Sequence, residues 1–95
     1  MDPFRKQLYN EIGSVWYRMV EAKSEHVAVG TIRVALTLWP DGKIAKLRVL
    51  SNTSNEAFAN TCLSAIRQTR IPPVPPELLK HGKFEDELSF TMKPN

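Results

Sequence analysis

Residues 27–51, VAVGTIRVALTLWPDGKIAKLRVLS, hold two runs of alternating apolar and polar residues on either side of a Pro-Asp-Gly turn. The first run covers residues 27–39 and the second covers residues 44–51. Because successive side chains of a strand point to opposite faces, each run predicts a strand with one buried and one solvated face. Pro presets φ in the turn and Gly tolerates positive φ, so the stretch predicts an antiparallel β-hairpin.

The register of this hairpin follows from which residues must be buried together. A three-residue loop would place Lys46 opposite Leu36 and bury its charge, which is costly in free energy. A four-residue loop over residues 40–43 keeps apolar residues opposite each other. We therefore expect three pairs on the buried face: Leu38 with Ala45, Leu36 with Leu47, and Val34 with Val49.

Upstream of the hairpin, apolar residues recur with the 3.6-residue period of an amphipathic helix. They are Phe4, Leu8, Ile12, Val15, Trp16, Met19 and Val20. With Pro3 at the start, this period predicts a helix over about residues 3–22, and the polar residues 23–26 form its exit. Gly13 in the middle costs up to ~1 kcal/mol relative to Ala, so the helix depends on packing.

Downstream, Thr53 and Glu56 have the spacing of a capping box and predict a helix over about residues 54–70. Its apolar face comprises Phe58, Cys62, Ala65, Ile66 and Thr69. Residues 71–76, IPPVPP, must be extended because proline supplies no amide donor and disfavours helix in the residue before it. Residues 77–80 then predict one helical turn, which ends at Gly82.

The last alternating run predicts a third strand over residues 84–92. Its inward residues are Phe84, Leu88, Phe90 and Met92, and its outward residues are Glu85, Glu87, Ser89 and Thr91. Asp86 falls on the inward phase, and we expect it near the open end of the strand, where water reaches it.

These elements predict an α+β fold in the order α-β-β-α-β. The second strand occupies one side of the first, so the third takes the other side, and the sheet is antiparallel with three strands in the order 2-1-3. Both helices pack on one face and the other face is open to water. A chain of 95 residues is too short for two separate cores, so we expect a single domain over residues 1–95.

Composition limits the function classes. Thirteen Lys and Arg against ten Asp and Glu give a net charge of only +3, and the basic residues form no run of five, so the usual sign of a nucleic-acid patch is missing. Cys62 is the single cysteine, which excludes an intrachain disulfide and predicts a buried thiol. No stretch approaches the ~20 apolar residues of a membrane span. The chain is therefore either cytosolic or a domain of a longer, anchored protein.

Catalytic groups do not converge in this sequence. His26 and His81 are isolated, without Cys or carboxylates at metal-ligand spacing, and no nucleophile elbow or phosphate-binding loop is present. Glu85, Asp86 and Glu87 are contiguous, but alternate side chains of a strand point apart. We interpret them as a guard of an edge strand against aggregation. We predict no catalytic residues, no metal, no cofactor and no enzymatic activity.

The outer edge of the third strand is the candidate binding site, because its unpaired amides and carbonyls can accept an extended peptide as a fourth strand. The candidate residues of this edge are Phe84, Glu85, Glu87, Ser89, Phe90, Thr91 and Met92.

Two alternative functions stay open. One is a cytosolic nucleic-acid-binding domain using Arg33, Lys46 and Arg48 on the open sheet face, which lacks the aromatic pairs of RNA-binding sheets. The other is a structural module whose edge pairs with its own copy, as a homodimer.

Several segments resemble the C-terminal domains of the periplasmic energy transducers TonB and TolA. The resemblance covers about residues 8–94. It rests on Tyr9, Ile12 and Trp16, on Gly30, on Pro40-Asp41-Gly42, on Asn55-Glu56-Ala57-Phe58 with Leu63-Ser64-Ala65-Ile66, on Ile71-Pro72-Pro73-Val74-Pro75, and on Phe90-Thr91-Met92-Lys93-Pro94. The closing segment is nearer the TolA type. The Tyr-Pro pair common after the tryptophan in TonB is missing at Trp16, and Ala59 replaces a common acidic residue, which also favours TolA.

The resemblance implies a periplasmic location at the end of an inner-membrane-anchored protein with a long linker. It implies docking to an outer-membrane receptor, a lipoprotein or another periplasmic protein, without nucleic acid. Inner-membrane motor subunits would be contacted only through regions N-terminal to these residues, and the motor role is implied by the family alone.

Overall fold

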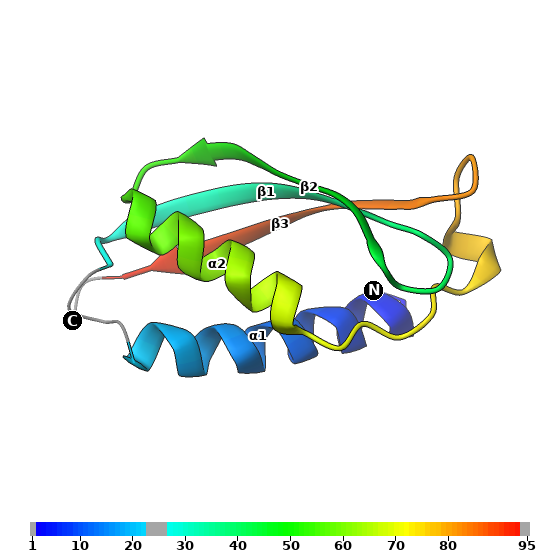
Figure 1. Cartoon of the computed structure of the whole chain (residues 1–95), viewed down its shortest axis with the longest axis horizontal. Coiled ribbons are helices and arrows are strands. Elements are labelled where there is room, and N and C mark those ends of the chain that lie inside the picture. Colours follow the sequence, from blue (N-terminus) through cyan, green and yellow to red (C-terminus); the bar gives the residue numbers. More distant parts are fainter. Residues whose placement is uncertain (1, 23–26, 94–95) are drawn as a thin grey trace.

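The computed structural model describes residues 2–22 and 27–93. Its elements are α1 (Pro3–Ala22), β1 (Gly30–Leu38), β2 (Ile44–Asn52), α2 (Glu56–Gln68), the 3₁₀ turn η1 (Pro76–Leu78) and β3 (Phe84–Met92), as Figure 1 shows. The predicted α-β-β-α-β order is confirmed. The predicted helix exit at residues 23–26, which includes His26, and Pro94 lie outside the described residues.

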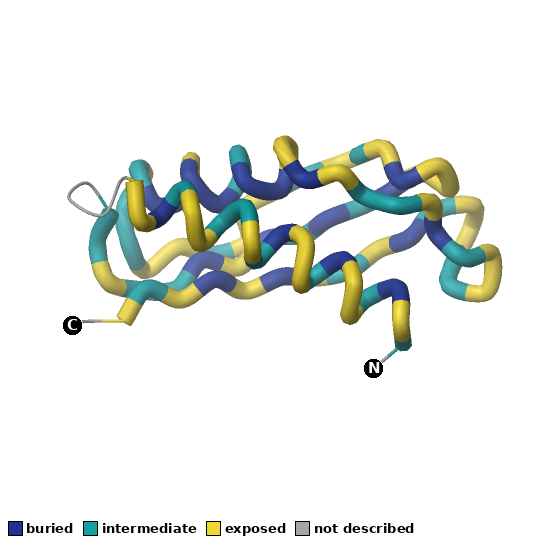
Figure 2. The backbone as a smooth tube through the Cα atoms, turned by 90° about the horizontal axis from the view of Figure 1, so that it is seen from below, coloured by how far each residue is buried: buried dark blue, intermediate teal, exposed yellow. Residues whose placement is uncertain are grey.

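The sheet has the predicted strand order, β2-β1-β3, with both pairings antiparallel. The two helices lie on one face of the sheet and the opposite face is uncovered (Figure 1). Viewed from the helix side, buried positions follow the inner sides of both helices and the strands behind them (Figure 2). The molecule is elongated, with principal extents of 41 × 22 × 21 Å, and α1 and β3 run along its long axis.

The core lies between the helices and the sheet. Its largest fully buried side chains include Phe58, Phe84, Leu8, Ile32 and Leu36. Trp16 joins α1 to both other layers, since its ring centroid lies 6.2 Å from that of Phe58 and 5.8 Å from that of Phe90. The predicted meeting of Trp16, Leu36, Phe58, Ile66 and Phe90 in one apolar cluster is confirmed.

The hairpin register is confirmed in its middle and wrong near the turn. Leu36 pairs with Leu47 and Val34 with Val49, as predicted, but Leu38 pairs with Ile44 and not with Ala45. Ala45 is skipped in β2, which is the pattern of a β-bulge. The backbone N–H of Trp39 donates to the carbonyl of Lys43 (2.8 Å), so the loop covers residues 40–42 and not 40–43 as expected. The bulge at Ala45 then restores the predicted pairing of Leu36 with Leu47.

A second irregularity bends β2 at its other end. Leu50 is skipped in the pairing, so that Arg33 lies opposite Ser51. Val49, which we expected on the buried face, is 37% exposed, and Leu50 beside it is 40% exposed. A bulge turns an edge strand away from the layer beneath it, which explains why the predicted burial is lost here.

The predicted first residues of β1 and α2 are both wrong, because the start of β1 contacts Thr53. β1 begins at Gly30 and not at Val27, because Gly30 has φ 141° and its backbone lies against Thr53. Thr53 accepts a hydrogen bond from the amide of Thr31 (2.8 Å) and is therefore not the helix cap. α2 begins at Glu56, and the cap is Asn55, whose side chain accepts from the amide of Phe58 (2.9 Å).

The connection from α2 to β3 follows the expected course with a shorter turn. Residues 71–75 form neither helix nor strand, and the predicted helical turn at 77–80 is the 3₁₀ turn of Pro76–Leu78. The amide of Val74 donates to the carbonyl of Pro40 (2.9 Å), which fixes the proline-rich segment to the hairpin turn. His81 lies exposed in the tight turn before β3 with φ 53°, the loop position expected for it.

Candidate functional site

The candidate site is the outer edge of β3. β3 pairs with β1 along its whole length, from Phe84 opposite Leu38 to Met92 opposite Gly30, without a register shift. In the sheet of the described residues it has a neighbour on one side only. The N–H and C=O groups that point to the other side are therefore available to a further strand.

The hydrogen bonds of β1 show which groups of β3 point outward. Thr31 accepts from the amide of Thr53 (2.9 Å) and Trp39 donates to Lys43, so odd-numbered residues of β1 bond toward β2. Alternate residues of a strand bond to opposite sides, so even-numbered residues of β1 bond to β3. In β3 the partners of these residues are also even-numbered. The N–H and C=O groups that point to the free edge belong to Glu85, Glu87, Ser89 and Thr91. One of them has a partner within the strand, because the amide of Glu87 donates to the carboxylate of Asp86 (2.9 Å).

The candidate residues of the edge therefore fall into two sets. Glu85, Glu87, Ser89 and Thr91 are exposed, and their side chains lie on the open face. Phe84 and Phe90 are buried and Met92 is half-buried, with side chains toward the core. The backbone groups of these three residues bond to β1, and their side chains pack in the core beneath the edge.

A groove of about 600 Å³ runs between α1 and the free edge of β3. Its strand wall is formed by residues 87–91, and its helix wall is formed by Tyr9, Ile12, Gly13 and Trp16. The surface of the groove is mainly apolar. From the sequence, Ile12 and Trp16 were expected on the packing face of the helix. Tyr9 was noted only for the family resemblance and Gly13 only for its cost to the helix, so none of the four was expected at a binding site. The signal that pointed to the groove was Gly13, a residue that weakens a helix interior without a visible local reason.

A polar cluster joins α1 to β3 beside this groove, and one of its members, Tyr9, also lines the groove. The phenol of Tyr9 donates to the carboxylate of Asp86, and Nε of Arg5 donates to the same oxygen at 3.3 Å. Arg5 also pairs with Asp2 (2.6 Å) and lies 4.8 Å over the ring of Phe84. We call Asp2, Arg5, Tyr9 and Asp86 the α1–β3 clamp. Asp86 thus has two partners on α1 that the sequence pattern did not predict. Its side chain is still 18% exposed near the start of β3, so water reaches it as expected.

The clamp shifts the pKa values of Asp2, Arg5 and Tyr9. Burial, followed by the hydrogen bond to Asp86, raises the pKa of Tyr9 to about 12, so the phenol is a donor at neutral pH. The pKa of Asp2 is lowered, chiefly by the hydrogen bond from the amide of Arg5. The pKa of Arg5 is raised, chiefly by its hydrogen bond to Asp2. The one guanidinium of Arg5 is therefore shared by two carboxyl groups, those of Asp2 and Asp86.

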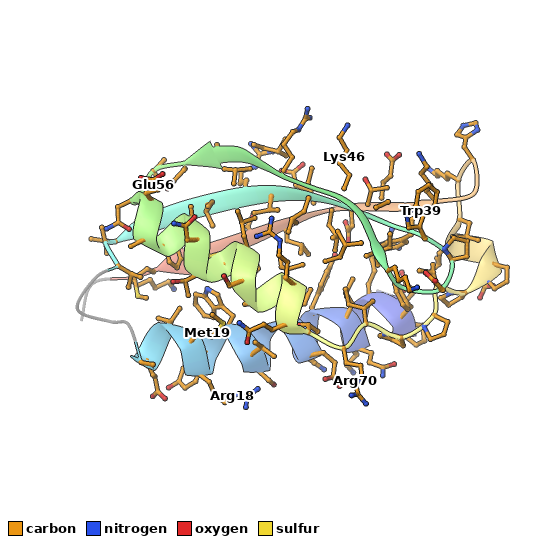
Figure 3. The ribbon with its side chains drawn as sticks, viewed as in Figure 1. Arg18, Met19, Trp39, Lys46, Glu56 and Arg70 are labelled. Atoms are coloured by element: carbon orange, nitrogen blue, oxygen red, sulfur yellow. The ribbon has the colours of Figure 1, made fainter. Side chains whose placement is uncertain are left out.

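The open face of the sheet brings only some of its predicted basic residues together. Arg33 forms an ion pair with Glu87 on the neighbouring strand, so its charge is balanced. Lys46 and Arg48 line a shallow pocket of about 340 Å³ with Trp39, which is 45% exposed. Nζ of Lys83 lies 5.0 Å from the centroid of the Trp39 ring. Trp39 and Lys46 project on the side away from the helices (Figure 3). Trp39 was not expected on this face from the sequence pattern.

The remaining reactive groups do not form a catalytic centre in the part of the chain that the structure describes. Cys62 is buried, and burial raises the pKa of its thiol to about 12, which keeps it protonated and inert. Among residues 2–22 and 27–93, no three His, Cys, Asp or Glu residues gather as metal ligands. No helix within these residues has the length and apolarity needed to cross a membrane.

An α+β module with an open strand edge and an apolar groove beside it belongs to the class of protein-binding domains. The family model described as Gram-negative bacterial TonB protein C-terminal matches residues 21–92, more than half of the chain. The chain therefore belongs to the TonB C-terminal domain family. Domains of this family are non-enzymatic modules that generally bind outer-membrane receptors in energy transduction, typically in the periplasm.

A solved structure shows the same fold. The chain is similar to the C-terminal domain of TonB from Helicobacter pylori, determined by NMR in solution over residues 179–285 of that protein. The TM-score is 0.57 at 15% identity, with 94% of this chain and 84% of that chain covered. No curated protein sequence matches the chain. Both similarities are to TonB, and neither supports the preference for the TolA type.

Proposed function

We propose that residues 1–95 form one periplasmic docking domain of a TonB-type energy transducer, which binds its partner by adding a partner segment to the free edge of β3. The partner is an extended segment of an outer-membrane receptor, with lipoproteins and other periplasmic proteins as the alternatives. The domain would stand at the C-terminal end of an inner-membrane-anchored protein, and motor subunits would act through regions outside residues 1–95.

The observation that supports this proposal is the row of outward backbone groups on β3: the C=O groups of Glu85, Glu87, Ser89 and Thr91, and the N–H groups of Glu85, Ser89 and Thr91. The amide of Glu87 donates to Asp86 instead. An added strand satisfies such groups with main-chain hydrogen bonds, which supply affinity without a particular side chain. The last part of the edge, residues 89–92, is uncharged and contains residues that favour strands. The acidic first part is partly neutralised, because Asp86 belongs to the clamp and Glu87 pairs with Arg33.

Amide mapping tests the proposal directly. Isotope-labelled protein is titrated with peptides from periplasmic segments of outer-membrane receptors, and the shifted amide resonances are assigned. We expect the largest shifts at Glu87, Ser89 and Thr91. Shifts confined to the helices or to Ile44–Asn52 would show that the partner does not use this edge.

Two substitutions at one position separate the backbone from the side chain. Ser89→Pro removes an outward amide donor but no donor to β1, so we expect binding to be lost while the fold is retained. Ser89→Ala keeps the amide, so we expect binding close to that of the wild type. Equal loss of binding in both variants would contradict main-chain recognition. Circular dichroism of Ser89→Pro confirms that its sheet is intact.

A further inference from the structure

We propose that the groove between α1 and β3 receives two apolar side chains of the partner segment, two residues apart, and that Gly13 leaves the space for one of them. This inference rests on the proposed strand addition, since it concerns the side chains of the added strand. It commits to one kind of partner, an extended segment in which apolar residues stand at alternate positions.

The pairing geometry determines which partner side chains enter the groove. Residues directly opposite each other on neighbouring strands place their side chains on the same face of the sheet. Leu88 and Phe90 point toward the helix layer and are buried. The partner residues opposite these two therefore also point toward the helix layer, beside the groove walls. The partner residue between them points to the open face, next to Ser89, where water accepts a polar side chain.

Gly13 is unnecessary for the packing of the domain itself. A Cβ atom built on Gly13 meets nothing within 4 Å, so no neighbouring group requires a glycine there. Gly also destabilises a helix interior relative to Ala. Tyr9 and Trp16, four residues before and three after, stand on the same side of α1 and line the same groove. The missing side chain at residue 13 therefore forms a notch between two aromatic side chains.

The chemistry of the groove favours aliphatic or aromatic guests. Its surface is mainly apolar, and the clamp lies beside it, where Arg5 is shared between Asp2 (2.6 Å) and Asp86 (3.3 Å). Burial of a charged guest without a partner would be unfavourable, whereas an apolar guest gains from leaving water. The outward N–H and C=O groups of Ser89 and Thr91, with the C=O group of Glu87, run along the groove and match an extended chain; the amide of Glu87 already donates to Asp86.

A second copy of this chain would fill the groove less well. If its β3 paired with this edge, its Leu88 and Phe90 would be committed to its own core, in which they are only 7% and 8% exposed. Such a pairing would leave the groove without side chains. A free segment has both of its faces available, so it satisfies the edge and the groove together.

Designed peptides test the inference. Blocked peptides of about eight residues, the length of a strand, carry Leu, Val, Phe or Tyr at two positions i and i+2 in a background of Thr, Ser and Lys. The reference peptide carries Ser at both positions. We expect at least one peptide with an apolar pair to bind roughly tenfold more tightly than the reference peptide. The same peptide should shift the amide resonances of Ser89 and Thr91 and the indole N–H resonance of Trp16.

Substitution at Gly13 provides the matched protein variants. Gly13→Leu fills the notch, and we expect the preference for the apolar pair to fall by roughly tenfold, to the level of the reference peptide. Ser14→Leu adds the same side chain at the next, exposed residue and leaves this preference unchanged. Gly13→Ala is the smaller change and keeps the fold even where Gly13→Leu perturbs it. We expect its loss of binding to the apolar-pair peptide to be intermediate.

The outcomes separate this inference from the proposed function. If the apolar pairs bind at β3 no better than the Ser reference, or if Gly13→Leu binds as the wild type does, the groove inference is wrong while strand addition stands. If neither these peptides nor receptor segments shift the amides of β3, strand addition itself is wrong. If sedimentation shows a dimer that the peptides do not dissociate, the occupant of the edge is a second copy.

Discussion

The phenol of Tyr9 on α1 donates a hydrogen bond to the carboxylate of Asp86 on β3, across 77 positions of the sequence. Arg5 donates to the same carboxylate oxygen from one turn earlier on α1. The N-terminal half of the helix is thereby fixed to the first half of the edge strand. The distance between the two walls of the groove depends on this contact as well as on the apolar core.

Tyr9→Phe is expected to lower the free energy of unfolding by about 1 kcal/mol. The variant keeps the ring but loses a hydrogen bond to a charged group that is partly open to water, which reduces the value of the bond. Chemical denaturation at neutral pH measures the change. Tyr17→Phe is the control, because Tyr17 is 60% exposed. Equal stability of Tyr9→Phe and the wild type would mean that the clamp does not contribute to folding.

The wild type is expected to lose stability as the pH rises from 10 toward 12, and Tyr9→Phe is expected to lose less. The pKa of Tyr9 is raised from 10 to about 12 by burial and by Asp86, with Arg5 and Asp2 nearby. The unfolded chain releases this proton first, so the stabilisation is complete below the unfolded pKa and disappears above the folded one. Cys62 shifts in the same direction and contributes equally in both proteins. Parallel curves for the two proteins would contradict this assignment.

Cys62 is expected to react with iodoacetamide only when the domain unfolds. The thiol is fully buried in the core and its pKa is raised to about 12, so neither access nor thiolate is available in the folded state. Mass spectrometry of alkylation against denaturant concentration should follow the unfolding transition. Alkylation of the folded protein at the rate of free cysteine would show that α2 opens independently of the rest.

Phe58→Ala is expected to lower the free energy of unfolding by ~3–5 kcal/mol, and Trp16→Ala by a similar amount, through the cavity that each leaves. Phe58 is fully buried and touches the Trp16 ring, which links the two helices. A domain of this size has only about 5–15 kcal/mol to lose, so denaturation midpoints should shift strongly. A change below about 1 kcal/mol would mean that α1 is not docked as described.

Two glycine substitutions are expected to change the free energy of unfolding in opposite directions. Gly30→Ala should destabilise the domain by about 2 kcal/mol or more, because φ is 141° and the new Cβ would lie 2.7 Å from the backbone of Thr53. Gly13→Ala should stabilise it by up to about 1 kcal/mol, since the helix gains a better residue without a clash. Thermal melts of the two variants make the comparison. Destabilisation by both would show that residue 13 is constrained by the fold.

Much of the fold could be predicted because burial alone decides it. The alternation in residues 84–92 predicted the bounds of β3, and the need to bury Leu36 with Leu47 predicted the central register. The first residue of α2 was harder to predict. Thr53 and Asn55 are both able to cap a helix, and the choice depends on Thr31, 22 residues earlier in the chain, which engages Thr53. Local patterns do not contain that contact.

The candidate site could be predicted in part. The position of the open edge follows from the strand order, but which amides point outward depends on hydrogen bonds of β1 that only the structure contains. Asp86 stood out in the sequence as a carboxylate on an inward phase, yet its partners on α1 are more than seventy positions away, 77 for Tyr9 and 81 for Arg5. Gly13 was noticed only as a weakness of the helix. Its position beside the edge emerged when α1 and β3 were placed together.

The clamp also has a mechanical consequence for a domain of an energy-transducing family. α1 and β3 run along the same long axis, and the clamp ties the first turns of α1 to the start of β3 (Figure 1). Tension applied to the first turn of α1 along that axis would reach Asp86 without passing through the hairpin or α2. The force on a segment paired with β3 would then act parallel to the strands, in shear. Its hydrogen bonds would bear this force together and would not break one after another.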